Sequence, residues 1–341
     1  MKRFLITTVA STLLSSAAYA ETLVVSSWGG SFRDLIDQTI AAKFTEETGV
    51  AVEFITGGTI DRLNQAMLMR DTPESDVTFT TSHIGWLYNN DGLFEELDMS
   101  RIPNAANLVE QAKISPSHIG AWAYVYTIGY LPDALPEGFT FESWEDLWSP
   151  ELAGMVAAPD FDPSHIIAVA SRLEGVDIEN WEEATDKLLA LRPNFRAFYT
   201  NDANSQQLMT TGETPVQILL SMNAYHMQSQ GIDVQLAIPK EGAVLGVDTM
   251  GITAGTDKVD LAYQFINAAL DPEVQAQIAE IKKGIPVVTN VELPEELASL
   301  PGIFTSAEQW DTEALIIPHE LRAEKTAEWR QWFSENMIAG N

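Results

Sequence analysis

The sequence predicts an α/β fold. Apolar segments of strand length alternate with amphipathic segments of helix length along almost the whole 341-residue chain. Residues typical of helix ends and helix starts lie between these segments, such as Thr48-Gly49 at an end and Asp271-Pro272 at a start. The length suits about two domains with cores of their own. Because no low-complexity linker interrupts the chain, we expect strands to join these domains.

Residues 1–20 have the pattern of a secretory signal. Lys2 and Arg3 precede an apolar stretch, and Ala18-Tyr19-Ala20 is a small-x-small cleavage site. A membrane anchor is the alternative, but the stretch is shorter than the roughly 20 residues of a spanning helix. We expect cleavage after Ala20 and export to the periplasm, since no cysteine follows for a lipid anchor.

The composition excludes several classes of function. The chain has no cysteine, so it has no disulfides, thiolate metal site or cysteine nucleophile. Residues 1–20 hold two of the 19 basic residues, which leaves 17 basic against 49 acidic side chains and a net charge of −32. Such a charge repels nucleic acid and anionic lipid. Solubility of an exported protein explains it without any particular ligand.

The first strand leads into an unusual turn. Residues 23–25 (Leu-Val-Val) are apolar, and Ser26 and Ser27 lead from them into Trp28-Gly29-Gly30-Ser31. Ser31 is expected to cap a helix over 31–48, whose apolar face includes Phe32 and Phe44. A glycine turn at a helix start leaves bare N–H groups for a ligand, and Trp28 offers a flat wall beside them.

The later elements follow from periodicity and capping signals. The aromatic segment 121–130 suits a strand that crosses between domains, and Asp257 or Asp260 is expected to cap a helix over 261–269. Segment 294–311 has a loop composition. The remaining strands are expected at 50–55, 76–79, 217–220, 234–238 and 244–253, and helices at 61–70, 84–96, 143–147, 166–172, 181–191, 272–281 and 320–337.

The sequence gives no positive support for an enzyme. The five histidines lack the close spacing of a metal site, and there is no Gly-x-Ser-x-Gly elbow or phosphate loop. Acid pairs such as Glu46-Glu47 fall on expected exposed helix faces. We therefore predict no catalytic residue, metal or cofactor; a secreted hydrolase or lyase is the alternative of another class.

Two residues stand out as binding candidates. Trp28 ends a strand before a glycine turn, where burial in a core is awkward. Asp248 interrupts the apolar run 244–250, and a carboxylate there needs a partner or a solvent-filled cleft. A turn or cap is the alternative interpretation of Asp248.

Several motifs, in order, resemble the family 1 extracellular solute-binding proteins of ABC importers, and most of all the spermidine/putrescine-binding branch. These are 43–50 (KFTEETGV), 143–154 (SWEDLWSPELAG), 238–242 (IPKEG), Asp248-Thr249, 265–267 (FIN) and 271–274 (DPEV). The resemblance implies a two-lobed type II periplasmic binding fold that closes on a ligand. It implies hinge strands near 122–126 and 245–248, lobe one at about 22–122 plus 247–290, and lobe two at about 125–244 plus 291–341.

The resemblance also implies a site in which aromatic rings box an alkyl chain and carboxylates take ammonium ends. Trp28 matches the family's first tryptophan, Asp248 its amine-binding aspartate, and Asp160 or Asp162 its second-lobe acids. The chain differs where it has Met222-Asn223-Ala224, Gly246, Gly284-Ile285-Pro286 and His83. It also lacks the adjacent tyrosines of iron-binding relatives.

The expected ligand is a small amine-bearing solute, with a polyamine as the first candidate. We expect Trp28 and His83 on one side of it, Asp162, Asn223 and Tyr225 on the other, and Asp248 with Gly246 at the hinge. Gly29, Gly30 and Ser31 at the helix start, together with Arg196, favour an anionic group. A zwitterion such as γ-aminobutyrate is therefore the close alternative. The implied partner is an inner-membrane ABC permease, and the protein is expected to be a monomer.

Overall fold

A computed structural model describes residues 21–339; the predicted signal at 1–20 lies outside these residues. One mixed sheet runs through the molecule in the strand order β2-β1-β3-β9-β4-β7-β5-β6, with β10 on β9 and β8 on β4. The strands are β1 (Thr22–Ser27), β2 (Ala51–Thr56), β3 (Val77–Thr81), β4 (His118–Tyr130), β5 (Val156–Pro159), β6 (Phe195–Tyr199), β7 (Val216–Leu220), β8 (Gln235–Ala237), β9 (Ala243–Ile252) and β10 (Ala314–Leu315).

The helices cover both ends of this sheet. They are α1 (Ser31–Ile36), α2 (Ala42–Thr48), α3 (Thr59–Leu68), α4 (Ser82–Asn90), α5 (Ser164–Glu174), α6 (Thr185–Leu191), α7 (Asp202–Thr210), α8 (Ser221–Ser229), α9 (Val259–Ala269), α10 (Pro272–Lys282), α11 (Glu295–Ala298), α12 (Ala307–Thr312) and α13 (His319–Phe333). A π-helical turn, Asp37–Ala41, joins α1 to α2.

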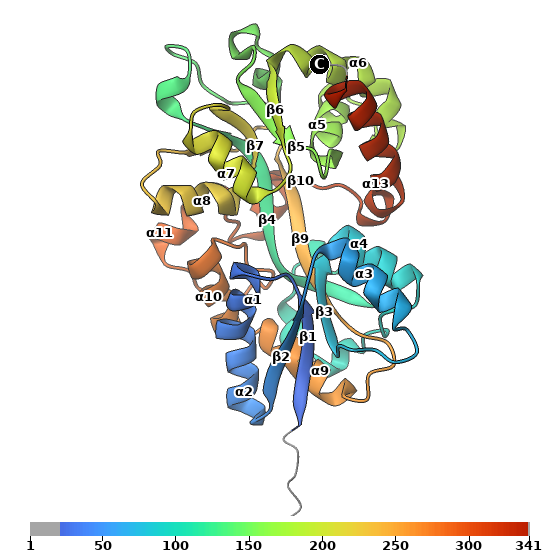
Figure 1. The fold of residues 1–341 in the computed structure, drawn as a ribbon. Helices are drawn as coiled ribbons and strands as arrows, with labels where there is room; N and C mark the ends of the chain where they lie inside the picture. The colour runs from blue at the N-terminus through green and yellow to red at the C-terminus, as the bar shows by residue number, and fades with distance from the viewer. Residues whose placement is uncertain (1–20, 340–341) are drawn as a thin grey trace, which may run out of the picture.

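Figure 1 shows two lobes with β4 and β9 running between them. We call β1–β3 with α1–α4 and α9 lobe one, and β5–β7 with α5–α8 and α13 lobe two. β9 pairs with β3 of lobe one, and β4 pairs with β7 of lobe two, while β4 and β9 pair with each other. The predicted crossing segments 122–126 and 245–248 lie in these two strands. The exact division into domains stays a prediction.

Most of the expected helices and strands are present, and several begin or end at the residues that the sequence predicts. Gly49 ends α2 in the left-handed conformation, and the Asp271 side chain caps α10. The predicted helix at 84–96 is shorter, since α4 ends at Asn90. The segment at 143–147 forms a 3₁₀ helix, although Ser143 caps it as its sequence indicates. Segment 294–311 contains α11 and the start of α12.

Two cap predictions are wrong. Gly30 is the N-cap of α1, with φ 60°, and Ser31 is already helical. A positive φ suits glycine, so the chain turns one residue earlier than a serine cap would turn it. Lys258 precedes α9, and neither Asp257 nor Asp260 caps it.

The hydrophobic core is continuous along the molecule. It includes apolar side chains from both lobes and from the crossing strands, and Trp122 on β4 is fully buried within it. The crossing strands are therefore fixed by packing on both faces, and their register decides which side chains meet between the lobes.

Candidate functional site

Asp248 lies at the centre of the crossing region. In the paired strands it is opposite Thr81 of β3 on one side and Trp122 of β4 on the other. It is 4% exposed and stands inside a ten-residue strand in which every residue is buried, so the turn or cap interpretation is excluded. Within residues 21–339, its carboxylate has one hydrogen bond, from the Tyr124 hydroxyl at 3.5 Å, and no ion pair.

The environment of Asp248 favours the binding of a cationic ligand. Burial raises the pKa of Asp248 to about 8, and Trp122, Tyr124 and Arg62 counter that rise only in part. An ionised carboxylate that is buried without a counter-charge carries a large desolvation cost. An ammonium group placed against it would remove this cost.

Aromatic rings line the same face of β4. Trp122, Tyr124 and Tyr126 alternate along the strand and so point to one side of the sheet. Tyr124 lies directly over Gly246: a Cβ at residue 246 would fall 2.1 Å from the Tyr124 Cε2 atom. Gly246 is one of the positions at which the chain differs from the polyamine-binding pattern, and a ring from the neighbouring strand covers it. Gly246 contributes space for that ring.

Gly246→Ala is expected to destabilise the protein by about 2 kcal/mol, because the added methyl overlaps the Tyr124 ring and forces it aside. Chemical denaturation measures this change. Gly29→Ala is the matched control, since its Cβ would meet Thr56 at an ordinary 3.8 Å. Equal stability of the two variants would contradict the close packing of Tyr124 on Gly246.

Trp28 stands at the carboxyl end of β1, beside this face. Its indole N–H donates to Thr59 Oγ1 at 2.8 Å, and its ring centroid lies 6.4 Å from that of Trp122. The buried Arg62 guanidinium lies 5.3 Å from the Trp28 ring centroid. One neighbour of this ring is therefore already cationic. Gly29, Gly30 and Ser31 are exposed, and Ser31 Oγ accepts from Lys282 Nζ at 2.7 Å.

Asp162 lies on the lobe-two side but is not a free carboxylate. Arg322 of α13 donates to Asp162 Oδ2, and the Ser164 amide and hydroxyl donate to Oδ1. Burial pushes the pKa of Asp162 upward, but Arg322, His165 and His83 outweigh it and hold that pKa well below its ordinary value. Its negative charge is thus compensated within the protein.

His83 opens α4 and faces this pair from lobe one. Its side chain is 9% exposed, and its Nδ1 has no hydrogen-bond partner among residues 21–339. Burial and then the charge of Arg322 lower the pKa of His83 to about 3. The structure therefore brings His83, Asp162 and Arg322 together, as α4 and α13 are in contact.

Asn223 holds a further carboxylate, that of Asp202. The Asn223 amide donates to Asp202 Oδ1 at 2.9 Å. Burial raises the pKa of Asp202, while Asn223 and the charge of Lys282 counter that rise. Tyr225 turns away to donate to the Pro301 carbonyl at 2.5 Å, which ties α8 to the C-terminal segment.

Arg196 stands apart from the other candidates. It lies on β6, at the end of the sheet order farthest from β3 and β9 in lobe two, and its side chain is exposed. Sequence reasoning missed Arg62, Asp202 and Arg322. A signal existed for Arg322: it is seven residues before Trp329, so a basic side chain falls on the buried face of the last helix. We find no comparable signal for Arg62 or Asp202.

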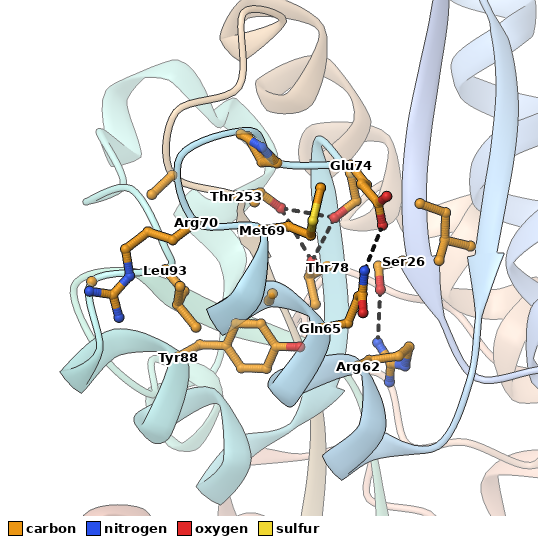
Figure 2. A pocket seen from close by; sticks show the side chains of 16 residues that line it. Ser26, Arg62, Gln65, Met69, Arg70, Glu74, Thr78, Tyr88, Leu93 and Thr253 are labelled. Atoms are coloured by element: carbon orange, nitrogen blue, oxygen red, sulfur yellow. Dashed lines mark hydrogen bonds between the residues drawn. The ribbon is translucent and has the colours of Figure 1, made fainter.

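A separate pocket lies wholly within lobe one, between α3, α4 and β3, and Figure 2 shows it from close by. The hydroxyls of Ser75, Thr78 and Thr253 bond one another at 3.2–3.3 Å, and Gln65 donates to Glu74. Arg62 bonds to Ser26 at its inner end. Most polar groups of this pocket form hydrogen bonds with one another, whereas the polar groups around Asp248 do not.

The crossing region thus combines a buried carboxylate, aromatic walls and groups from both lobes, which is a binding arrangement. The model of the bacterial extracellular solute-binding proteins matches residues 39–305. The chain belongs to this family. Its members are binding proteins of ABC transporters and not enzymes, which confirms the non-enzymatic prediction.

Individual relatives agree on the fold. The spermidine/putrescine-binding periplasmic protein of Escherichia coli K12 is 26% identical over 293 residues, 82% of each chain. A crystal structure of an ABC transporter protein from Clostridium perfringens matches with a TM-score of 0.79 at 28% identity, over 93% of this chain and 100% of the other. The Atu4243–GABA receptor has a TM-score of 0.79 at 22% identity, over 92% and 97%.

The two-lobed α/β prediction is therefore confirmed, and this chain is the substrate-binding component of an ABC transporter. Between residues 21 and 339, no helix has both the length and the apolar character needed to cross a membrane.

Proposed function

We propose that this protein captures a small solute that bears an ammonium group and that Asp248 is its counter-charge. The main support is the buried carboxylate of Asp248, which has no basic partner in the described chain and lies beside Tyr124 and Trp122. Ring faces attract cations, and an ionised acceptor makes strong hydrogen bonds with an ammonium donor. Trp28 lies against Trp122 and can add a further wall, and the negative charge of Asp202 acts on Asp248 by raising its pKa.

Two classes of solute meet this requirement. A polyamine is the first candidate, because relatives are named for spermidine and putrescine, and Asp202 offers a second carboxylate. A zwitterionic amino acid is the second, because a GABA receptor shares the fold and Arg322 adds a buried cationic group. Either solute would be delivered to a membrane permease of the same transporter.

A panel of solutes tests the proposal directly. Putrescine, spermidine, γ-aminobutyrate and a neutral control, 1,4-butanediol, are titrated calorimetrically into purified protein. At least one amine should bind and raise the melting temperature by mass action, and the diol should do neither. Absence of binding by every amine, or equal binding of the diol, would overturn the proposed role of Asp248.

We also propose that the protein works as a periplasmic monomer from which residues 1–20 have been removed. The periplasmic relatives and the signal pattern support this. Intact mass of the protein from a periplasmic extract and its sedimentation coefficient test both points.

A further inference from the structure

α4 of lobe one packs against α13 of lobe two, and the first turn of α4 offers N–H donors. Thr81 is the N-cap but makes no side-chain cap bond, and the nine-residue helix begins at the carboxyl end of β3. The first N–H groups of a helix have no intrahelical acceptor, and the helix dipole favours an anion there.

Buried side chains around this turn are also unpartnered. Ser82 is 1% exposed, and its Oγ has no hydrogen bond to any residue described, nor has the Nδ1 of His83. Across the lobes Arg322 is 5% exposed; its Nη2 bonds to Asp162 and His165, but its Nε has no partner in residues 21–339. Native proteins rarely leave such donors unpaired, so an acceptor group is expected to reach them.

The lobe-two side already holds a buried cation. Arg322 is 5% exposed and donates to Asp162 Oδ2. The second ammonium group of a diamine would meet this guanidinium as a like charge, whereas the carboxylate of a zwitterion would meet it as an opposite charge. A zwitterion also adds no net charge, so its burial leaves fewer uncompensated charges.

The spacing favours a short solute. Thr81 is the direct cross-strand neighbour of Asp248, and Ser82 and His83 follow it. Side chains that face each other in this way are about 5 Å apart at Cβ. A molecule only a few methylenes long can therefore reach from Asp248 to the α4 turn.

We propose that the Ser82–His83 turn of α4, together with Arg322, binds a carboxylate, so that the solute is a short amino acid and not a polyamine. This rests on the proposed function, since the ammonium group of the same solute pairs with Asp248. Arg322 then has two roles: it neutralises Asp162 through Nη2 and offers Nε to the solute.

Matched solutes test the inference on the unmodified protein. Calorimetry compares 5-aminovalerate with putrescine, which has the same four methylenes but a second ammonium group in place of the carboxylate. It also compares γ-aminobutyrate with its amide, in which a neutral amide group replaces the carboxylate. We expect each amino acid to bind at least tenfold more tightly than its matched analogue. If putrescine binds as tightly as 5-aminovalerate, the inference is overturned.

Variants then test which residues bind the carboxylate of the solute. Ser82→Ala should weaken amino-acid binding about tenfold. Thr80→Val is the matched control. Thr80 Oγ1 is also buried and has no hydrogen-bond partner in the part of the chain that the structure describes. It is one strand position before Thr81 and points to the other face of the sheet, so affinity should not change. Arg322→Lys keeps the charge beside Asp162 and removes Nε, and it should lower amino-acid affinity at a retained melting temperature. Unchanged affinity in both Ser82→Ala and Arg322→Lys would overturn the assignment.

The two proposals fail differently. Tight putrescine binding that depends on Asp248 and on Asp202 would overturn the carboxylate site and leave the ammonium site standing. Absence of binding by diamines and amino acids alike would overturn both.

Discussion

Asp248→Asn will abolish solute binding and, at the same time, make the unliganded protein more stable. The variant keeps the shape of the side chain and its contact with Tyr124 but removes the charge that pairs with ammonium. Loss of one partner of a buried charge pair weakens binding by at least about 100-fold. Stability rises because the wild-type protein holds a buried carboxyl group that has no basic partner in residues 21–339.

The stability gain has a definite pH dependence. The pKa of Asp248 is about 8 in the folded protein against an ordinary value of 3.8, so the folded state holds a proton that the unfolded state has lost. This proton uptake makes the wild-type protein less stable as pH rises from about 4 to 8. The advantage of Asp248→Asn is therefore small at pH 4 and reaches several kcal/mol at pH 8, since one pKa unit corresponds to about 1.4 kcal/mol.

Urea denaturation of both proteins at pH 4, 6 and 8 measures this difference. Effects of the buried histidines occur in both proteins and cancel in the comparison. A variant that is less stable than wild type at pH 8, or that retains amine binding, would show that Asp248 is a structural residue.

Affinity for the solute will rise about 50-fold between pH 6 and pH 8, and binding near pH 7 will release close to one proton. With a pKa of about 8, Asp248 is mostly protonated at pH 7 in the free protein. An ammonium group pairs with the ionised form only, so each pH unit below 8 costs about tenfold in affinity.

Neighbouring groups do not supply this pH dependence. Arg62 stays charged, and burial keeps the pKa of Tyr124 well above the range. His83 and His165, with pKa values of about 3 and 4, are neutral throughout pH 6–8. Burial raises the pKa of Asp202, so Asp202→Asn is the control that separates its contribution.

Calorimetry in buffers of high and low ionisation enthalpy measures the released proton, because the observed binding enthalpy then differs between buffers. The solute amine stays protonated over this range, as a lysine side chain does. An affinity that is flat from pH 6 to pH 8 would mean that Asp248 is already ionised before the solute arrives.

Much of the fold could be predicted from local signals. Gly49 and Asp271 mark helix ends because a left-handed turn and an N-cap depend on a few neighbouring residues. Asp248 could be singled out because a carboxylate in an apolar strand run is anomalous by itself. The motifs along the chain indicated the solute-binding family, which the comparison confirms.

The chemistry around Asp248 could not be predicted in the same way. The family resemblance implies that Asp162 takes an ammonium group, but Arg322, 160 residues later, compensates its charge. Gly246 carries no side chain that could hint at an aromatic wall, and only the pairing of β4 with β9 places Tyr124 over it.

The sequence by itself determined the order of the elements, the family and the one anomalous carboxylate, because these depend on local periodicity and on motifs. The tertiary structure alone decided which charges meet, which donors lack partners among residues 21–339 and which ring lies over Gly246. Pairing and burial depend on strand register and on helix contacts between residues far apart in the chain, and no local pattern encodes them.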